Sequence, residues 1–224
     1  MTEPDAADLL DQVYSQRFAD ADAARKDAVW QVLCAHLQRY VPDDGVVLDL
    51  ACDRGDFIRH TRARERWAAD LRDVSRFLPD GVRFVQSDGL ELAAHVPSDY
   101  FDLVFVSNYL EHLSSGEQVV EQLRVVAGTL KPGGRVLVLQ PNIRLTGQAY
   151  WDFIDHKVAL TERSLVEAAE LAGFATETLV KRFIPYTTKG RLPLWRSFTR
   201  AYLKFRPAWW LLGKQTLYVG RRRA

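Results

Sequence analysis

Apolar and polar positions alternate along the chain in a way that predicts strands separated by helices. Apolar runs typical of buried strands occur at 46–50, 66–70, 82–86, 101–107, 135–140 and 175–184, and KQTLYVGRR near the C-terminus predicts a last strand. Most of the stretches between them are helical in pattern or rich in turn residues. The sequence therefore predicts an α/β fold with a central, mostly parallel seven-stranded sheet flanked by helices.

Three helix signals stand out between these runs. Residues 24–40 carry apolar side chains at three- and four-residue spacing, which predicts an amphipathic helix over the core: Val29, Trp30, Leu33, Leu37 and Tyr40. In LKPGGRVLVL a helix is predicted to end at Pro132, Gly133 and Gly134, just before a strand. In LTERSLVEAAELAGF, Thr161 is the expected N-cap and Gly173 the expected stop.

Length and composition predict a single domain, because 224 residues with 47% hydrophobic side chains suffice for one good core. We divide 1–224 into an N-terminal helical cap (1–43), a core (44–184), a basic aromatic helical insertion (185–213) and a last strand with a tail (214–224). The two cysteines, Cys34 and Cys52, show neither a CxxC pair nor zinc-ligand spacing, as expected in the reducing cytoplasm. No signal peptide or membrane-spanning segment is expected, since the apolar run AWWLL is too short.

The ligand is expected where the first two strands end, because open α/β sheets bind ligands at the carboxyl ends of their strands. Asp49 ends the first strand, and Asp70 ends the second 21 residues later, in position to bond ribose hydroxyls. Between them Asp53 would repel a pyrophosphate, which argues against NAD, and GxxxxGK[ST] is absent, which excludes ATP bound in that manner. S-adenosylmethionine carries adenosine, no phosphate and a positive sulfonium, so it fits better. Alternatively, Asp53 caps a helix that begins near Gly55, and capping does not exclude ligand binding.

These residues resemble the class I S-adenosylmethionine-dependent methyltransferases. DLACDRG keeps Asp49 and Gly55 of the family's first motif, in which an acidic residue is followed by x-Gly-x-Gly-x-Gly. Asp70, Asp88 in QSDGLEL and the segment FDLVFVSNYLEHL follow in the family's order, and with LKPGGRVLVL and ELAGF they extend the resemblance over about residues 44–184. The resemblance implies a Rossmann-like fold, S-adenosylmethionine as cofactor, and cofactor contacts from Asp49, Ala51, Cys52, Gly55, Asp70, Asp88, Gly89 and Asn108.

Other segments resemble a narrower branch associated with sugar and surface-glycan biosynthesis. They are RKDAVWQVLCAHLQRYVP, YWDFIDHKVALTERSL, GRLPLWRSFTRAYLKF and LLGKQTLYV. This resemblance ranks sugar acceptors first. It implies an O-methyltransferase acting on a sugar or glycan intermediate, whereas N- or C-methylation of a small natural product and a non-catalytic binding subunit remain the alternatives.

A hydroxyl acceptor gains from a general base, and histidine has a suitable pKa. His112, after the fourth strand, and His156, after the fifth, are the candidates, with a packing or capping role as the alternative for each. Asp152 or Asp155 is expected to orient His156. Glu111 is a third candidate, although a residue before a histidine on the same turn often points to solvent. The other three histidines are expected at the surface: His36, His60 and His95. No metal site is predicted.

The C-terminal part is strongly basic, since residues 181–224 hold 12 Lys or Arg and no Asp or Glu, whereas the remainder holds 18 basic and 29 acidic residues. One helical face is expected to carry Leu194, Trp195, Phe198, Ala201, Tyr202 and Phe205, and another Arg196, Arg200 and Lys204. Either the aromatics complete the core while the basic face is solvated or paired, or the helix is a lid or docking surface. Its partner would then be a phosphate-bearing acceptor, such as a nucleotide- or lipid-linked sugar, or an anionic membrane surface. No nucleic-acid partner is expected.

Overall fold

The computed structural model describes residues 23–186 and 196–223 and contains one seven-stranded sheet with the order β3-β2-β1-β4-β5-β7-β6. Its strands are β1 (Val46–Leu50), β2 (Glu65–Asp70), β3 (Val82–Gln86), β4 (Phe101–Ser107), β5 (Leu130–Pro141), β6 (Phe174–Val180) and β7 (Gln215–Arg222). The first five strands are parallel, and β7 runs antiparallel to both β5 and β6. The predicted α/β class and the mostly parallel sheet are confirmed.

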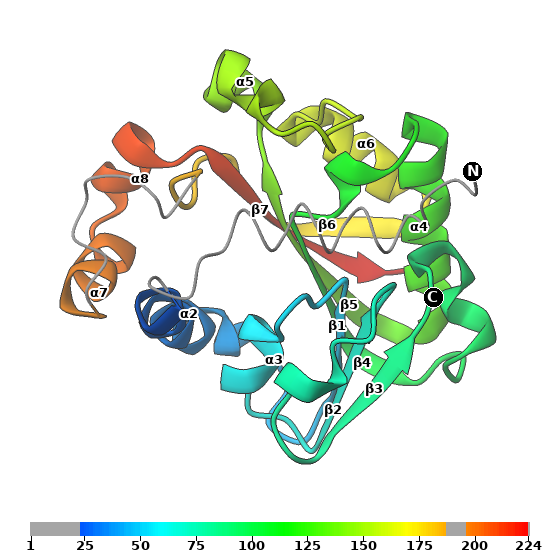
Figure 1. Ribbon diagram of the computed structural model, residues 1–224. Coiled ribbons are helices and arrows are strands. Elements are labelled where there is room, and N and C mark those ends of the chain that lie inside the picture. The colour runs from blue at the N-terminus through cyan, green and yellow to red at the C-terminus, as the bar shows by residue number, and fades with distance from the viewer. Residues whose placement is uncertain (1–22, 187–195, 224) are drawn as a thin grey trace, which may run out of the picture.

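Helices cover both faces of the sheet (Figure 1). The helices are α2 (Ala23–Leu37), α3 (Asp56–His60), α4 (Gly116–Thr129), α5 (Ile143–Thr146), α6 (Glu162–Leu171), α7 (Arg196–Lys204) and α8 (Arg206–Leu212). Short 3-10 turns lie at Gln38–Tyr40, Ser75–Phe77, Gly89–Ala94, Leu110–His112 and Gly147–Asp152. One core joins α2, α3, α7 and α8 to one face, and a second joins α4 and α6 to the other. In the described part of the chain, no helix is both long and apolar enough to cross a membrane.

Several predicted boundaries are confirmed and one is wrong. The side chain of Thr161 accepts from the backbone of Ser164 in a capping box, and Gly173 follows α6 with φ 92°, as a glycine stop does. The helix α4, however, ends at Thr129, so the Pro-Gly-Gly segment belongs to the start of β5. That start is irregular, with a register shift against β4 between Phe101 and Leu103, which the proline and glycines accommodate.

The basic helix α7 buries a different face from the one predicted. Thr199, Tyr202 and Leu203 are buried, whereas Phe198 and Phe205 are 36% and 61% exposed. The buried face of α7 packs on α2, and the hydroxyl of Tyr202 donates to the carbonyl oxygen of Phe183 at 2.7 Å. The helix α8 folds back on α7: the indole Nε1 of the buried Trp209 donates to the carbonyl oxygen of Tyr202 at 2.8 Å. The buried aromatic side chains therefore come from both helices, Tyr202 from α7 and Trp209 from α8. Leu194 and Trp195 lie outside the described residues.

Candidate active site at the carboxyl ends of the strands

The predicted site residues gather at one edge of the sheet. Asp49 stands in register with Ala68 of β2 and Phe105 of β4, one residue before β1 ends. Asp70 ends β2, and the loops after β3, β4 and β5 begin at the same edge. Carboxyl ends of neighbouring parallel strands meet in this way, which is where open α/β sheets bind ligands.

The loop after β1 keeps a glycine-type backbone at positions where the chain has no glycine. Ala51, Asp53 and Gly55 have φ angles of 54°, 48° and 72°, all in the left-handed region. A left-handed residue with a Cβ costs about 1–2 kcal/mol, and aspartate tolerates this region better than alanine does. The three positions at which the family motif has glycine are thus all left-handed here, although two of them hold other residues. A side chain at Gly55 would also collide with Leu78, whose Cδ2 lies 2.5 Å from an ideal Cβ.

Asp53 does not cap α3. The N-cap of α3 is Gly55, which makes no side-chain capping bond. Instead, Oδ1 of Asp53 accepts from Nη2 of Arg72 at 3.0 Å, and its Oδ2 lies 3.7 Å from Nζ of Lys26. The capping interpretation is therefore wrong, because the helix begins two residues too late for Asp53 to reach its free N–H groups.

Asp49 and Cys52 are both buried beneath this loop. Oδ2 of Asp49 accepts from the backbone N–H of Ile58 at 3.2 Å. Burial raises the pKa of Asp49 well above its ordinary value; the Ile58 hydrogen bond opposes that shift, and the nearby carboxylates reinforce it. Cys52 donates its N–H to the carbonyl oxygen of Ala69 at 3.1 Å, and burial raises the pKa of its thiol. Cys52 is thus a backbone anchor between the loop and β2, with a neutral thiol.

Asp70 is already the acceptor of several hydrogen bonds. Its Oδ2 accepts from the N–H of Asp53 at 2.9 Å, and its Oδ1 accepts from the N–H of Arg72 at 3.0 Å and from Nε of Arg72 at 3.3 Å. Arg72 consequently bridges the carboxylates of Asp53 and Asp70. Neither Arg72 nor Lys26 was identified from the sequence, because no motif marks them and only the folded loop brings them to these acids.

The segments after β3 and β4 meet each other closely. The Asp88 side chain accepts from the N–H of Leu90 at 2.8 Å and begins the short 3-10 helix there. An ideal Cβ on the neighbouring Gly89 would lie 2.3 Å from Oη of Tyr109 and 2.6 Å from Oε1 of Gln122. Glycine is therefore required by packing at this position. Asn108 follows β4 with φ 49°.

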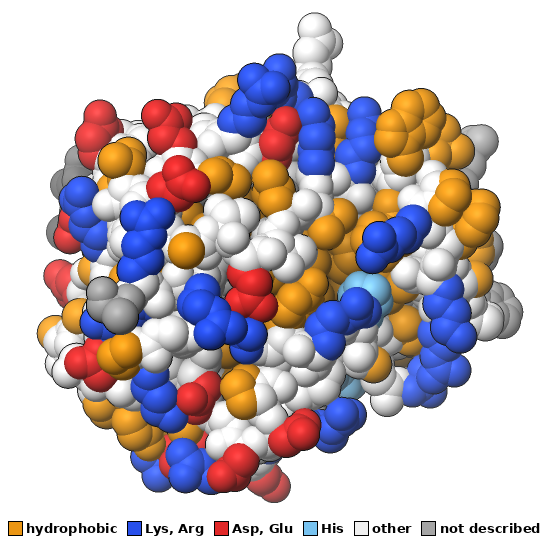
Figure 2. Space-filling view, turned by 180° about the vertical axis from the view of Figure 1, so that it is seen from behind, with side chains coloured by type: hydrophobic (Ala, Val, Ile, Leu, Met, Phe, Trp, Pro, Cys, Tyr) orange, Lys and Arg blue, Asp and Glu red, His pale blue; other side chains and the backbone are white. Residues whose placement is uncertain are grey.

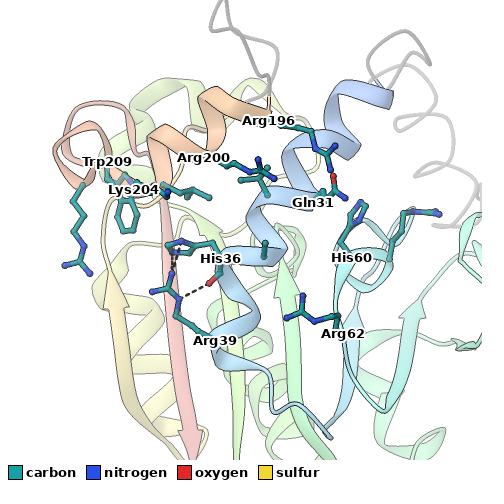
Figure 3. A pocket seen from close by; sticks show the side chains of 14 residues that line it. Gln31, His36, Arg39, His60, Arg62, Arg196, Arg200, Lys204 and Trp209 are labelled. Carbon is teal, nitrogen blue, oxygen red and sulfur yellow. Dashed lines mark hydrogen bonds between the residues drawn. The ribbon is translucent and has the colours of Figure 1, made fainter.

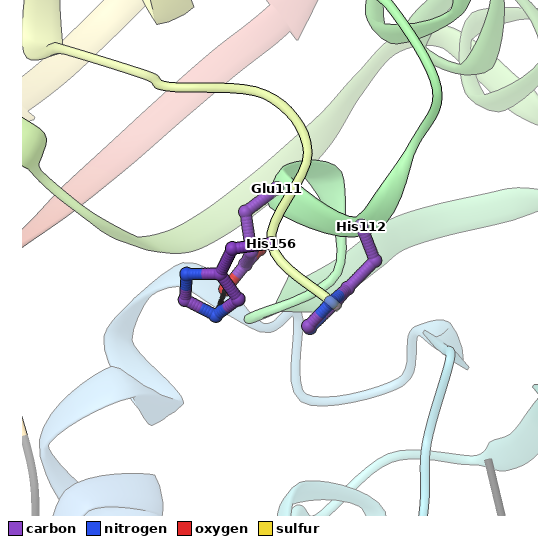
Figure 4. Close-up of side chains that lie close together, drawn as sticks. All are labelled: Glu111, His112 and His156. Carbon is purple, nitrogen blue, oxygen red and sulfur yellow. Dashed lines mark ion pairs between the residues drawn. The ribbon is translucent and has the colours of Figure 1, made fainter. Parts of the chain in front are cut away.

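Glu111, His112 and His156 form a cluster between two loops (Figure 4). Glu111 and His112 lie in the 3-10 turn after β4, and His156 lies in the segment after β5. The carbonyl oxygen of Glu111 accepts from the N–H groups of Lys157 and Val158 at 2.8 and 3.0 Å, which fixes the two segments together. The rings of His112 and His156 have centroids 5.0 Å apart. The structure thus brings together the two histidines that the sequence singled out.

The two histidines differ in access. The side chain of His112 is 19% exposed and that of His156 only 5%, with Tyr150 and Phe153 packed against the latter at centroid distances of 4.8 and 5.1 Å. Nδ1 of His112 lies 3.0 Å from the carbonyl oxygen of Asp155. A carbonyl can only accept, so Nδ1 carries the proton and Nε2 of His112 is the basic nitrogen.

The predicted orienting groups are placed differently. Oδ2 of Asp155, the carboxylate expected to orient His156, lies 3.4 Å from Nδ1 of His112. Asp152 is exposed. Close to His156 is Glu111, whose Oε1 lies 4.0 Å from Nε2 of His156. Sequence spacing along one segment suggested Asp155 for His156, whereas the fold of that segment turns it toward the β4 loop.

Glu111 is fully buried, so the expectation that it points to solvent is wrong. Its Oε2 accepts from Nε2 of Gln140 at 3.0 Å. Burial raises the pKa of Glu111, and the positive charge available on His112 opposes that shift. One ligand atom from each of Glu111, His112 and His156 lies within 4.8 Å of the others, a spacing from which a metal ion could be held. All three residues were candidates from the sequence, but their spacing could not be predicted, because they come from two loops.

Of the remaining histidines, His36 departs from the surface position expected for it. It is half-buried against Phe183 and Trp209, with ring centroids 5.6 and 5.8 Å away. Burial, together with the positive charges of Arg39 and Arg206, lowers the pKa of His36 to about 4. His60 pairs with Asp27 at 2.8 Å, and His95 is exposed.

A seven-stranded sheet of this order, with its acidic loops at the carboxyl edge, defines a Rossmann-like α/β domain of the methyltransferase type. The model of the family described as a methyltransferase domain matches residues 23–179, which is most of the chain. The chain belongs to this family.

One curated relative and two solved structures place the chain among known proteins. The ubiquinone/menaquinone biosynthesis C-methyltransferase UbiE of Azotobacter vinelandii is 32% identical over 122 residues, and the match covers 46% of this chain and 46% of UbiE. The chain thus matches about half the length of that relative. The fold is shared with an S-adenosylmethionine-dependent methyltransferase from Archaeoglobus fulgidus (TM-score 0.62, 19% identity, 86% of this chain and 94% of the other). It is also shared with one from Mesorhizobium loti (TM-score 0.61, 21% identity, 84% and 96%).

Proposed function

We propose that the chain is an S-adenosylmethionine-dependent methyltransferase that methylates a hydroxyl group of its acceptor, with His112 as general base. The carrying observation is the contact of Nδ1 of His112 with the carbonyl oxygen of Asp155 at 3.0 Å, which leaves Nε2 of a partly exposed ring free to accept a proton. A base at the mouth of the strand-end site is what a hydroxyl acceptor needs.

The residues at the strand ends fit this cofactor. Ala51, Asp53 and Gly55 hold the backbone in the left-handed conformation that a close approach requires, and Asp70 presents a carboxylate at the end of β2. Around the loop three carboxylates, Asp53, Asp56 and Asp70, pair with two cations, Lys26 and Arg72, an acidic balance that disfavours a pyrophosphate and favours a cationic sulfonium. When bound, the cofactor supplies an electrophilic methyl group. Asp70 would hold the ribose hydroxyls, and Asp88 would lie near the adenine.

In the transfer, the chain's own groups position the acceptor and move one proton. Nε2 of His112 would take the hydroxyl proton as the oxygen bonds to the methyl carbon; the sulfur–methyl bond would break at the same time, and its electron pair would stay on sulfur, which leaves as a neutral thioether. The imidazolium that results is stabilised by the carbonyl oxygen and the carboxylate of Asp155. His156 and the buried Glu111 support the ring from behind, so the cluster keeps His112 in place while Nε2 remains accessible.

A sugar or glycan-type acceptor is the substrate class that we propose. Its support is the resemblance of the flanking segments to a sugar-associated branch. Beside the histidine cluster, Trp151 is 53% exposed and Ile154 is 89% exposed, which offers apolar surface to one face of a ring. A sugar ring has an apolar face that could pack on Trp151 and Ile154 while one of its hydroxyl groups meets the base.

C-methylation is the second candidate, and it rests on the similarity to a protein named as a C-methyltransferase. A base can equally remove a proton from an activated carbon acid or from a phenol whose ring carbon is methylated. The two candidate functions, O-methylation and C-methylation, therefore both use His112 as the base and differ in the acceptor atom.

The test is transfer of labelled methyl from S-adenosylmethionine to a panel of acceptors: nucleotide sugars, free glycans, aminosugars, phenols and quinols. We expect a labelled methyl ether on a sugar hydroxyl, located by NMR, with transfer lost in the His112→Gln protein. A methyl on a ring carbon would establish the second candidate instead. Cofactor binding without transfer to any acceptor, in the wild-type protein, would point to a non-catalytic subunit.

A further inference from the structure

We propose that α7 and α8, together with the outer face of α2, form a docking surface for an anionic phospholipid membrane. A cavity of about 1010 Å³ lies among these helices and the end of α3, separate from the strand-end site (Figure 3). In the proposed docking, lipid phosphate groups enter the cavity and the apolar side chains of α8 enter the headgroup layer.

All the permanently charged side chains that line the cavity are positive. Its lining holds seven Arg or Lys residues and no Asp or Glu: Arg39, Arg59, Arg62, Arg196, Arg200, Lys204 and Arg206. They come from the 3-10 turn after α2, from α3 and the segment after it, and from α7 and α8, and Figure 3 shows Arg200 directed from α7 toward α2. Positive charge of this density in a concave site attracts multiply charged anions.

These cations lack acidic partners in the described structure. Elsewhere in the basic C-terminal part, Lys181 pairs with Glu162 at 2.9 Å and Arg221 with Glu177 at 3.4 Å. Within residues 23–186 and 196–223, by contrast, none of the seven cavity cations forms an ion pair with a carboxylate. The basic C-terminal part therefore differs along its length: Lys181 and Arg221 pair with carboxylates of the body, whereas Arg196, Arg200, Lys204 and Arg206 of α7 and α8 form no ion pair with a described carboxylate.

Large apolar side chains project beside these cations. Phe205, Trp210 and Leu211 are 61%, 72% and 70% exposed, and Lys204 and Arg206 flank Phe205. The supporting scaffold is rigid, because Trp209 between them is buried and hydrogen-bonded to the carbonyl oxygen of Tyr202. On the face in Figure 2, blue Lys and Arg side chains gather next to exposed orange side chains on the side where α7 and α8 lie.

The combination selects a membrane over a soluble phosphate compound. A soluble anion would need the cavity cations, but it would gain nothing from tryptophan, phenylalanine and leucine side chains directed into solvent. An anionic bilayer uses both, since cations meet lipid phosphates while tryptophan and leucine enter the interface. The inference does not depend on the acceptor proposed above.

The test is co-sedimentation of the full chain with vesicles of phosphatidylcholine alone and with vesicles that also contain about 30% phosphatidylglycerol, whose surface is strongly negative. We expect binding only to the anionic vesicles, decreasing with salt. The Arg200→Ala/Lys204→Ala protein should bind about 30-fold more weakly, because each cation near an anionic surface contributes about 1 kcal/mol to binding. Its matched control is Arg124→Ala/Arg163→Ala, which removes two exposed cations from α4 and α6 on the opposite face and should bind normally.

The apolar contribution has its own pair of variants. Leu211→Ser should weaken binding by about tenfold, because the leucine side chain that would enter the lipid interface is lost. Leu171 is 61% exposed on α6, and Leu171→Ser should leave binding unchanged. Quenching of tryptophan fluorescence by brominated lipid should be lost in Trp210→Phe. Circular dichroism melts verify that each variant is folded.

Three results would overturn the proposal. One is equal binding to neutral and anionic vesicles, and another is loss of binding in the control double variant as in the cavity variant. The third is binding of soluble pyrophosphate, dependent on Arg200 and Lys204, without any binding to vesicles; it would assign the cavity to a soluble phosphate compound. Failure here leaves methyl transfer untouched, since transfer is measured without vesicles.

Discussion

His112 and Asp155, 43 residues apart in the chain, meet where Nδ1 of the histidine lies 3.0 Å from the Asp155 carbonyl oxygen and 3.4 Å from its Oδ2. The contact ties the turn after β4 to the segment after β5. It also settles the tautomer of the ring, because the carbonyl accepts the Nδ1 proton. Nε2 of His112 is therefore the nitrogen that can accept a proton.

The first prediction concerns this base. His112→Gln should reduce kcat by roughly 100-fold to 10,000-fold, the usual scale for loss of a general base, with nearly unchanged affinity for S-adenosylmethionine. The pH profile of the variant should lose its acidic limb. Steady-state kinetics and calorimetric titration check the two parts. Near-normal turnover in the variant would shift the role to His156.

The second prediction concerns metal removal. We expect dialysis against EDTA to leave turnover unchanged, because a metal on Nε2 of His112 would occupy the lone pair that the base needs. Glu111 and His156 then act as supports of the ring. Loss of turnover on dialysis, with recovery on addition of one divalent ion, would identify the cluster as a metal centre and refute the base assignment.

The third prediction follows from the buried Glu111. Burial raises its pKa in the folded state above the ordinary value of 4.5, so folding favours the protonated acid. That contribution is present below the unfolded pKa and is lost as pH rises through 4.5 toward the raised folded value. Glu111→Gln mimics the neutral acid. Its Tm should match that of the wild type near pH 4 and exceed it increasingly toward pH 8, measured by thermal denaturation; a constant difference would contradict the assignment.

The fourth prediction tests the cofactor site. Asp70→Asn should weaken S-adenosylmethionine binding by roughly 10-fold to 100-fold, since hydrogen bonds to a charged group contribute about 1.5–3 kcal/mol. Asp73→Asn is the control, because Asp73 lies three residues away and its carboxylate accepts from the N–H and the hydroxyl of Ser75 in its own turn. Calorimetric titration of both variants decides. Equal affinity in the two would show that the ribose lies elsewhere.

The sheet could be predicted well from the sequence, because a buried strand shows as a short run of apolar residues. The run 46–50 is apolar at every position but Asp49, and β1 has these same bounds. The pairing of His112 with Asp155 and the burial of Glu111 could not be predicted, since each depends on two loops meeting after folding. The buried face of α7 was misjudged for the same reason, because its packing on α2, Phe183 and Trp209 decides which of its residues are covered. Periodicity within one helix does not contain that information.

The last prediction concerns Ala51, which stands with φ 54° where the family motif has its first glycine. A left-handed alanine costs about 1–2 kcal/mol, while a glycine there loses about 0.5–1 kcal/mol more chain entropy on folding. Ala51→Gly should therefore raise the free energy of unfolding by up to about 1 kcal/mol, or the Tm by about 2–4 °C for a chain of this size. Ala168→Gly is the matched control: Ala168 is buried inside α6, so the same substitution should destabilise by about 1 kcal/mol. Chemical denaturation of both proteins measures the two shifts. Opposite signs would confirm that the loop carries backbone strain at Ala51, whereas a loss of stability in both would mean that the alanine side chain stabilises the loop by more than its left-handed backbone costs.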